Sequence, residues 1–324
     1  MSRVGAARVV CAGMLTVDLV QTLDRLPRAD QKVVARSQRL ELGGPATNAA
    51  RTAAALGLRP LLVAPFGAGP LTAFVRRQLA ADGVDWLDPL TGQENPAPLS
   101  SVLVTLSTGE RAVVSGGAPL VPAQWRLGSA ADGAAAVLVD GHGGSLPARV
   151  AAAGRAHGIP VLLDGGSYKD GMTRYLSDID LAVLSADFTP PEGGPPLDWA
   201  LRQGVGAAAR SAGAGPIRLR RQGIDQEVAV PEVAVVDTNG AGDVLHGAAL
   251  AALAATGRAP NRYAEVLAFA ARVASASVGF AGALGWAADD GLRVALRSDL
   301  RALGVACAAQ QTGAVRGERT APGV

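Results

Sequence analysis

A thirteen-residue stretch, VVDTNGAGDVLHG at 235–247, concentrates the residue types that could carry chemistry. An apolar run precedes it and an alanine-rich run follows, so we expect a strand over 233–237, a glycine turn over 240–242 and a helix from Asp243. The start of such a helix offers unpaired N–H groups to an anion, and glycines let the anion come close. A carboxylate beside that cradle would repel the anion. We therefore interpret Asp243 as a base that takes a proton from a substrate hydroxyl.

The same stretch also has a plainer explanation. An acid is common in the first turn of a helix, where it faces the positive end of the helix dipole, and glycines are common in tight turns. Asp237, at the end of the expected strand, either orients a hydrated Mg²⁺ or fixes the loop. The position of this stretch among the surrounding strands and helices distinguishes these interpretations.

Short β-rich runs alternate with alanine-rich helical patterns through most of the chain. We expect strands over 9–20, 61–65, 102–106, 136–140, 161–164, 181–184, 217–220 and 233–237. We expect helices over 46–56, 71–81, 146–156, 197–212, 243–255 and 263–277. A strand-then-helix repeat predicts an α/β fold with a central, mostly parallel sheet and helices on both faces.

Two segments interrupt this alternation and look like β-ribbons of mixed polarity. They lie near 18–44 and 98–117, and we expect them to form a small β lid over the main sheet. Residues 1–309 are expected to form a single domain. The polar tail over 310–324 is expected to be disordered.

Composition excludes several classes of function. Of 324 residues, 49% are hydrophobic, and 30 basic residues nearly balance 28 acidic ones. Without a basic stripe interleaved with aromatics, no nucleic-acid partner is expected. Lysine occurs only at Lys32 and Lys169, neither in a Gly-Lys-Ser/Thr context, so a P-loop is excluded. Two isolated cysteines and the lack of a long apolar run predict a soluble protein of a reducing cytoplasm, with no membrane partner.

A second motif, LGGPATNAARTAAALG over 42–57, precedes the glycine turn by about 190 residues. Together with DTNGAGD and the following HGA, it resembles the paired signatures of the PfkB carbohydrate kinases, a ribokinase-like family. The resemblance covers roughly residues 8–290. It implies a ribokinase-like fold in which Gly240, Ala241 and Gly242 form an anion hole and Asp243 is the catalytic base.

The resemblance also implies residues that bind a sugar. These are the acid in CAGMLTVDLV, the glycine pair and amide of the second motif, the acid in VLVDGHGG and the arginine of the lid, namely Asp18, Gly43, Gly44, Asn48, Asp140 and Arg111. Plainer alternatives stay open. The glycine pair also suits a loop before a helix with Pro at its first position, and an arginine in a β-turn is commonly just exposed.

The nucleotide half of the expected site departs from the family pattern. Ser185 and Phe188 replace a polar Asn-x-x-Glu pair, and IRLRRQG is matched to a Thr-x-Gly-x-x-Gly turn, with Arg218 and Arg220 at the altered positions. Lys169 lies just after the end of an expected strand. It either lies close to the phosphoryl group in transfer or is an ordinary solvated lysine in a loop. The residues expected to bind the cofactors ATP and Mg²⁺ are Lys169, Ser185, Arg218, Gly223 and Asp237.

The resemblance therefore implies an ATP-dependent kinase that phosphorylates a hydroxymethyl group of a small sugar. Two alternatives stay open: a nucleoside kinase of the same fold, and a non-catalytic sugar-binding protein on this scaffold. A partial dinucleotide motif, LLVAPFGAGPLT, lacks its third glycine and gives little support to a reductase. A homodimer through the edges of the β lid is also expected.

Overall fold

The computed structural model describes residues 6–94, 97–108 and 110–317. Its centre is a nine-stranded sheet in the order β13-β12-β11-β10-β9-β8-β1-β4-β5. In that order, the strands are Ile224–Val228, Gly215–Arg221, Ala208–Ala212, Leu181–Leu184, Val161–Gly165, Ala136–Val139, Arg8–Ala12, Arg59–Val63 and Asp85–Leu87. All neighbours pair in parallel except β11–β12 and β12–β13. The expected α/β class with a mostly parallel sheet is confirmed.

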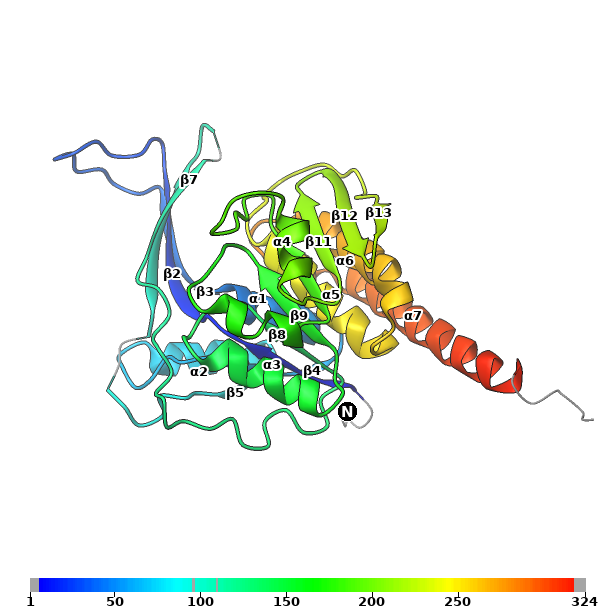
Figure 1. Ribbon diagram of the computed structural model, residues 1–324. Helices are drawn as coiled ribbons and strands as arrows, with labels where there is room; N and C mark the ends of the chain where they lie inside the picture. Colours follow the sequence, from blue (N-terminus) through cyan, green and yellow to red (C-terminus); the bar gives the residue numbers. More distant parts are fainter. Residues whose placement is uncertain (1–5, 95–96, 109, 318–324) are drawn as a thin grey trace, which may run out of the picture.

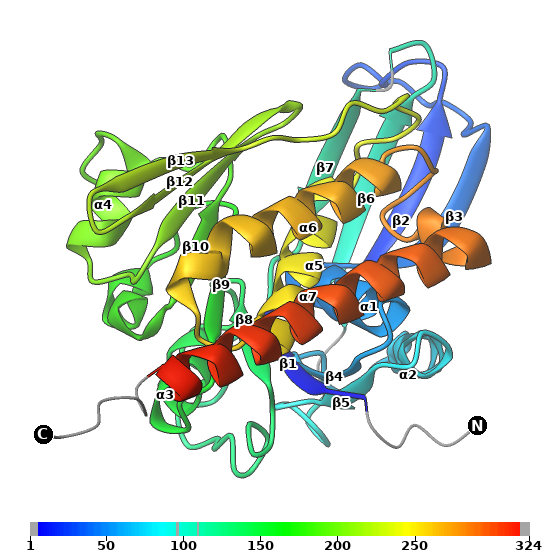
Figure 2. The ribbon, with the colours of Figure 1, turned by 90° about the vertical axis from the view of Figure 1, so that its right-hand side faces the viewer.

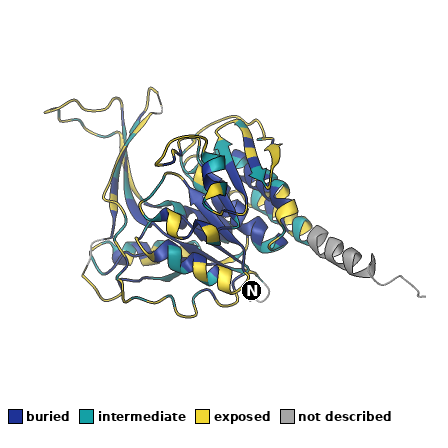
Figure 3. Ribbon diagram, in the orientation of Figure 1, coloured by how far each residue is buried: buried dark blue, intermediate teal, exposed yellow. Residues whose placement is uncertain are grey.

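Helices cover both faces of this sheet (Figures 1 and 2). One face carries α1 (Pro45–Ala55), α2 (Thr72–Ala81), α5 (Ala241–Thr256), α6 (Tyr263–Ser277) and α7 (Asp290–Gly317). The other face carries α3 (Leu146–Ala156) and α4 (Pro196–Arg202). Short 3₁₀ helices lie at Met172–Arg174, Leu176–Asp178, Pro260–Arg262 and Gly285–Ala288. The central strands are buried on both sides, which explains their unbroken apolar sequences (Figure 3).

A second sheet rises away from the main one, as Figure 1 shows. Its strand order is β3-β2-β6-β7, formed by Ser37–Gly43, Thr16–Leu23, Leu99–Thr105 and Arg111–Ser115. The inner strands β2 and β6 pair in parallel, and each outer strand is antiparallel to its neighbour. We call this sheet the lid. It lies within the two segments expected to form it, apart from the first residues of β2.

Three expected elements differ from the structure. The run 9–20 is divided between β1 and β2, which belong to different sheets, with Gly13 between them. The expected helix over 197–212 ends at Arg202, because Gly204 adopts a left-handed conformation and the alanines that follow pair with β10 as β11. The expected strand over 233–237 is absent. Its Val236 and Asp237 N–H groups both donate to the Val278 carbonyl instead of to a neighbouring strand.

The chain end also differs from the expectation. Helix α7 continues to Gly317, beyond residue 310, and residues 318–324 lie outside the described part of the chain. Strands β5 and β13 and helix α7 had no counterpart among the expected elements. Within the described residues, no helix is long and apolar enough to cross a membrane.

Candidate active site

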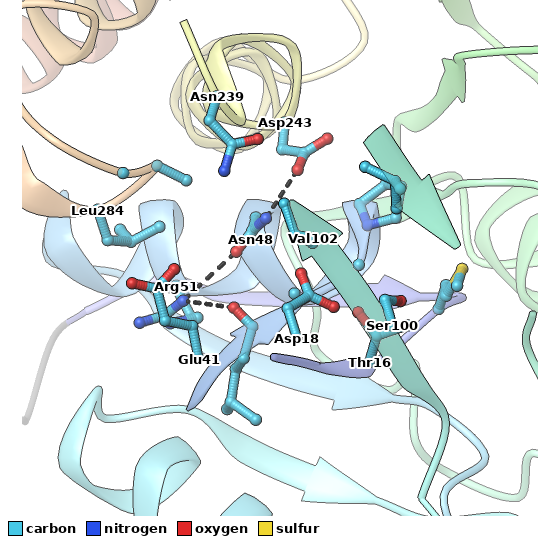
Figure 4. Close-up of a pocket in the computed structure, with 18 of the residues that line it drawn as sticks. Thr16, Asp18, Glu41, Asn48, Arg51, Ser100, Val102, Asn239, Asp243 and Leu284 are labelled. Atoms are coloured by element: carbon cyan, nitrogen blue, oxygen red, sulfur yellow. Dashed lines mark hydrogen bonds between the residues drawn. The ribbon is translucent and has the colours of Figure 1, made fainter. Parts of the chain in front are cut away.

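A cavity of about 670 Å³ lies between the lid and the start of α5 (Figure 4). This volume suits a small-molecule site. Its walls come from the lid, from the start of α1, from the turn that begins α5 and from the loop over 281–285. Six of the predicted site residues line it: Asp18, Gly43, Gly44, Asn48, Arg111 and Asp243. Gly240 does not line the cavity but lies against Ala283, which does.

Asp243 lies in the first turn of α5 and is half-buried. Its Oδ2 accepts a hydrogen bond of 2.7 Å from the Asn48 amide of α1, which Figure 4 draws. Burial raises the pKa of the Asp243 carboxyl, while the Asn48 hydrogen bond and the charges of His246 and Arg111 oppose that rise. A carboxylate with a raised pKa that faces a cavity is suited to accept a proton.

The turn before Asp243 has the backbone geometry that the predicted anion cradle requires. Gly240 is the N-cap of α5 and has a left-handed φ of 73°, and a Cβ added there would lie 2.4 Å from the Cβ of Ala283. The N–H groups of the first helical turn have no acceptor inside the helix. Gly242 has open space around its Cα, so an anion can approach these N–H groups.

Asp18 projects from β2 at the lid end of the cavity, opposite Ser100 of β6. Burial raises its pKa, hydrogen bonds from Thr16 and Ser100 oppose the rise, and the charge of Glu41 adds to it. Within the described residues, Oδ1 of Asp18 is buried without a hydrogen-bond partner. This oxygen therefore has the capacity to accept a hydrogen bond from a ligand hydroxyl.

Gly43 keeps space open next to Asp18. A Cβ added at Gly43 would lie 2.0 Å from Oδ2 of Asp18, so no larger residue fits without moving the carboxylate. Gly44 follows as the N-cap of α1 and also lines the cavity. The glycine pair thus brings bare backbone against the site, as the motif predicts.

Sequence reasoning missed several residues that line the same cavity. Arg51 lies one turn after Asn48 on α1, a spacing that places both on one helix face. Its Nε donates to Asp82 at 2.6 Å and its Nη1 to the Leu42 carbonyl at 3.1 Å, so much of the guanidinium is already engaged. Thr16, Glu41, Gln78, Ser100 and Asn239 also line the cavity.

Asp140 differs from its expected role as a sugar ligand. Its Oδ2 accepts the N–H groups of Met14 at 2.8 Å and Ala46 at 3.0 Å, and its Oδ1 accepts the N–H of His142 at 2.9 Å. Asp140 is buried and does not line the cavity. Because backbone groups from three segments occupy both oxygens, the structure corrects this interpretation to a structural tie.

Asp237 and Arg111 hold the loop around the anion cradle. The carboxylate of Asp237 accepts the N–H of Asn239 at 2.8 Å and that of Gly282 at 2.9 Å. This contact matches the loop-fixing alternative rather than the Mg²⁺ alternative. Arg111, from β7 of the lid, donates to Oδ1 of Asn239 and so crosses the mouth of the cavity.

Two predicted nucleotide residues lie on the loops that follow β9 and β10. Lys169 is half-buried and donates to Oγ of Ser167. Ser185 donates through Oγ to the Gly166 carbonyl at 2.7 Å. Neither residue lines the cavity. Phe188, which occupies a position where the family has a polar residue, is buried with its ring centroid 5.6 Å from that of Trp199.

The structure corrects the predicted roles of Arg218 and Gly223. β12 runs antiparallel to β11, so the β12–β13 turn at Gly223 lies at the edge of the sheet where the parallel strands begin. Arg218 pairs with Glu227 of β13 at 3.5 Å, beside a smaller hollow of about 240 Å³. The turn at the opposite, carboxyl edge is 210–215. This turn was not predicted from the sequence, because residues 197–212 were expected to form a helix.

No dedicated metal cage accompanies this site. Among residues 6–94, 97–108 and 110–317, no group of three or more His, Cys, Asp or Glu side chains could hold a metal ion.

Comparison with known proteins identifies a protein family that matches this chain. A model of the pfkB family of carbohydrate kinases matches residues 6–187 and 200–287. Ketohexokinase from Mus musculus is 25% identical over 107 residues, which are 33% of this chain and 36% of that protein. The chain spans between 26% and 36% of the length of the curated relatives that it matches.

Two solved structures share the fold over nearly their whole length. The ribokinase from Arabidopsis thaliana complexed with ribose and ATP has a TM-score of 0.70 and 23% identity, covering 90% of this chain and 99% of that one. The nucleoside kinase from Burkholderia thailandensis in complex with inosine has a TM-score of 0.67 and 15% identity, covering 90% and 97%.

Proposed function

Because this chain belongs to the pfkB family of carbohydrate kinases, we propose that it transfers a phosphoryl group from ATP to a hydroxymethyl group of a small sugar. The observation that carries the proposal is the position of Asp243. Its carboxylate is held by Asn48 at the wall of the cavity, directly beside the N–H groups of the turn over 240–242.

The sugar is proposed to lie between the lid and α1. Asp18, with an oxygen free to accept, and the backbone at Gly43 and Gly44 would bind its hydroxyls, and Asn48 would contact both the sugar and Asp243. Asp243 then accepts the hydroxyl proton as the oxygen attacks the terminal phosphorus. The charge that develops on the transferred group is stabilised by the N–H groups of Gly240, Ala241 and Gly242.

The N–H groups at the start of α5 are suited to bind a phosphate of ATP. Mg²⁺, as the partner of the nucleotide, would neutralise charge on the phosphates when bound. We assign no residue of this chain to the metal, since Asp237 is engaged by backbone N–H groups. Lys169 and Ser185 remain proposed on the nucleotide side, because both follow strands at the carboxyl edge of the sheet.

A sugar is favoured over a nucleoside by the lining of the cavity. Within the described residues, no aromatic side chain lines it, whereas the polar side chains of Thr16, Asp18, Asn48 and Ser100 do. A nucleobase would lack a stacking partner there. We also propose a homodimer that pairs through the lid, whose outer strand β7 is largely exposed.

The deciding experiment is a screen of sugars and nucleosides with Mg-ATP that measures ADP release and identifies the phosphorylated product. We expect turnover with at least one pentose or hexose. Product from nucleosides alone would favour the nucleoside alternative. No product, together with no ATP binding at millimolar nucleotide in calorimetry, would favour the non-catalytic alternative.

Asp243→Asn tests the proposed base. We expect kcat to fall by about 10²- to 10⁴-fold, the usual contribution of a positioned general base, while the sugar dissociation constant changes little. The matched control is Asp85→Asn, an exposed acid at the start of β5, which should retain full activity. Unchanged turnover in Asp243→Asn would remove this residue from the mechanism.

A further inference from the structure

Arg210 lies near the end of β11, at the edge of the main sheet where the parallel strands end. Its neighbours in register are Leu184 of β10 and Arg218 of β12. The guanidinium is half-buried, and its Nη2 donates to the Ala186 carbonyl in the loop after β10. Among the described residues, Nε is buried without a hydrogen-bond partner, and Nη1 has no partner either. Much of the donor capacity of this side chain is therefore unused.

The charge of Arg210 also lacks a partner. No acidic side chain in the described part of the chain forms an ion pair with it, whereas its cross-strand neighbour Arg218 has Glu227 at 3.5 Å. Like charges directly opposite each other on neighbouring strands are destabilising, and a charge removed from water is costly unless it is paired. A bound anion would supply the missing opposite charge.

The position of Arg210 relates it to the start of α5. Nε2 of His246, in the second turn of α5, is 3.0 Å from the Val183 carbonyl of β10. Val183 pairs with Ala209 of β11, so Arg210 lies one residue closer to the carboxyl edge and one strand further from the lid (Figure 2). Neighbouring strands are only about 4.8 Å apart. A row of phosphates that ends at the start of α5 can therefore extend across the end of β10 toward Arg210.

The side chain of Arg210 bends over this edge. Ala209 belongs to the core on the α5 side of the sheet, so alternation along the strand sends Arg210 to the opposite side. Its hydrogen bond to Ala186, two residues after the end of β10, then brings the guanidinium to the carboxyl edge. The charged group thus lies at the end of the strand, the place where open α/β sheets bind their ligands.

The backbone after Arg210 leaves this edge open. The register between β11 and β12 shifts between Arg210 and Ala212, as in a β-bulge, and such bulges commonly redirect a side chain next to a functional site. Gly213 follows with a left-handed φ of 58°, and nothing lies within 4 Å of a Cβ added there. The turn between the two strands therefore leaves room for a ligand beside β11.

We propose that Arg210 binds a phosphate of the nucleotide donor and so marks the donor side of the active site, across the end of β10 from the sugar side. A planar guanidinium with unused N–H groups suits a phosphate, which it can contact through two hydrogen bonds. The identity of the anion rests on the proposed kinase function. The presence of an anion site at Arg210 does not depend on it.

Calorimetry with two probes, Mg-ATP and inorganic tripolyphosphate, tests this contact. Arg210→Gln removes the charge, and Arg210→Lys retains it without the planar pair of donors. We expect the dissociation constant of both probes to rise by about 10- to 100-fold in Arg210→Gln and by less in Arg210→Lys, with the sugar dissociation constant unchanged.

The matched control is Arg202→Gln, which changes an exposed arginine at the end of α4 and should bind both probes as the wild type does. Equal binding by the wild type and both folded Arg210 variants would overturn the proposal. Weaker binding of Mg-ATP alone, with tripolyphosphate unaffected, would also overturn it, because Arg210 would then not contact the phosphates.

Labelling of the wild type with phenylglyoxal, which modifies arginine side chains, avoids any dependence on how a variant folds. We expect tripolyphosphate to protect Arg210 from modification and to leave Arg202 as reactive as before, as read from peptide masses. Failure to protect Arg210 in an active kinase would overturn this inference alone. Protection in a protein that phosphorylates no sugar would support the anion site and count against the proposed function alone.

Discussion

At the scale of single residues, neighbours decide what each buried carboxyl group can do. Asp140 follows an apolar strand and accepts three backbone N–H groups, whereas Asp243 follows a glycine turn and faces the cavity with an amide partner. Asp164 is a third case, since it is paired with His246 inside the protein. The residue type predicts a carboxylate, and the contacts determine its role.

Asp164 should make the stability of the protein depend on pH. Burial raises its pKa from the ordinary value of 3.8 to about 7. Between these values the folded state binds a proton that the unfolded state has lost, so the free energy of unfolding should fall as the pH rises toward 7. In Asp164→Asn this contribution is absent.

We therefore expect the free energy of unfolding of the wild type, relative to Asp164→Asn, to fall by on the order of 2 kcal/mol between pH 5 and pH 7. Urea unfolding at each pH measures this difference. Asp132→Asn, which changes an exposed acid, should track the wild type throughout. A difference that stays constant or grows with pH would contradict the raised pKa.

At the scale of elements, the site is assembled where the ends of several segments meet. Strand β8 ends at Val139, α1 begins at Pro45 and β2 begins at Thr16. The carboxylate of Asp140 joins these ends through its hydrogen bonds to Met14, Ala46 and His142. It thereby sets the position of α1, and with it the position of Asn48.

Asp140→Ala should accordingly destabilise the fold rather than only weaken sugar binding. Three backbone donors would lose a charged acceptor in a buried site, and we expect a loss of about 3 kcal/mol or more in urea unfolding. Asp170→Ala, at an exposed loop position, should cost less than about 0.5 kcal/mol. Wild-type stability combined with lost sugar affinity would restore Asp140 to the sugar site.

At the scale of the whole molecule, the cavity lies between the lid on one side and the starts of α1 and α5 with the loop over 281–285 on the other. Arg111 of β7 donates to Asn239 of the turn before α5, and most residues of β7 are exposed (Figure 3). Val114 of β7 is 75% exposed, although it lies in a strand at the open edge of the lid. An uncovered edge of this kind is a place for a second chain to pair.

Light scattering during gel filtration tests the proposed homodimer. We expect the wild type to elute with twice the mass of one chain, and Val114→Lys to elute as a monomer because a charge would be placed in the pairing edge. Val294→Lys, at an exposed valine of α7, should leave the mass unchanged. A monomeric wild type would remove the dimer from the proposal.

The sequence determined what depends on local pattern. The glycines and the acid predicted a turn followed by a helix with Asp243 in its first turn, and the alternating runs predicted the parallel sheet. Turn chemistry and burial leave such signals in neighbouring residues. The sequence did not separate 197–212 into a helix and a strand, because alanine favours a helix by intrinsic propensity, whereas pairing with β10 makes residues 208–212 a strand.

Only the tertiary structure decided which distant groups meet. Asp140 accepts a hydrogen bond from the backbone of Met14, 126 residues away in the sequence. Arg218 lies on a strand that is antiparallel to its neighbour β11. His246 contacts the carbonyl of Val183, 63 residues away. These contacts are hydrogen bonds and charge pairs across separate elements. They follow from how the strands are ordered in the sheet, and that order leaves no mark on the spacing of residues along the chain.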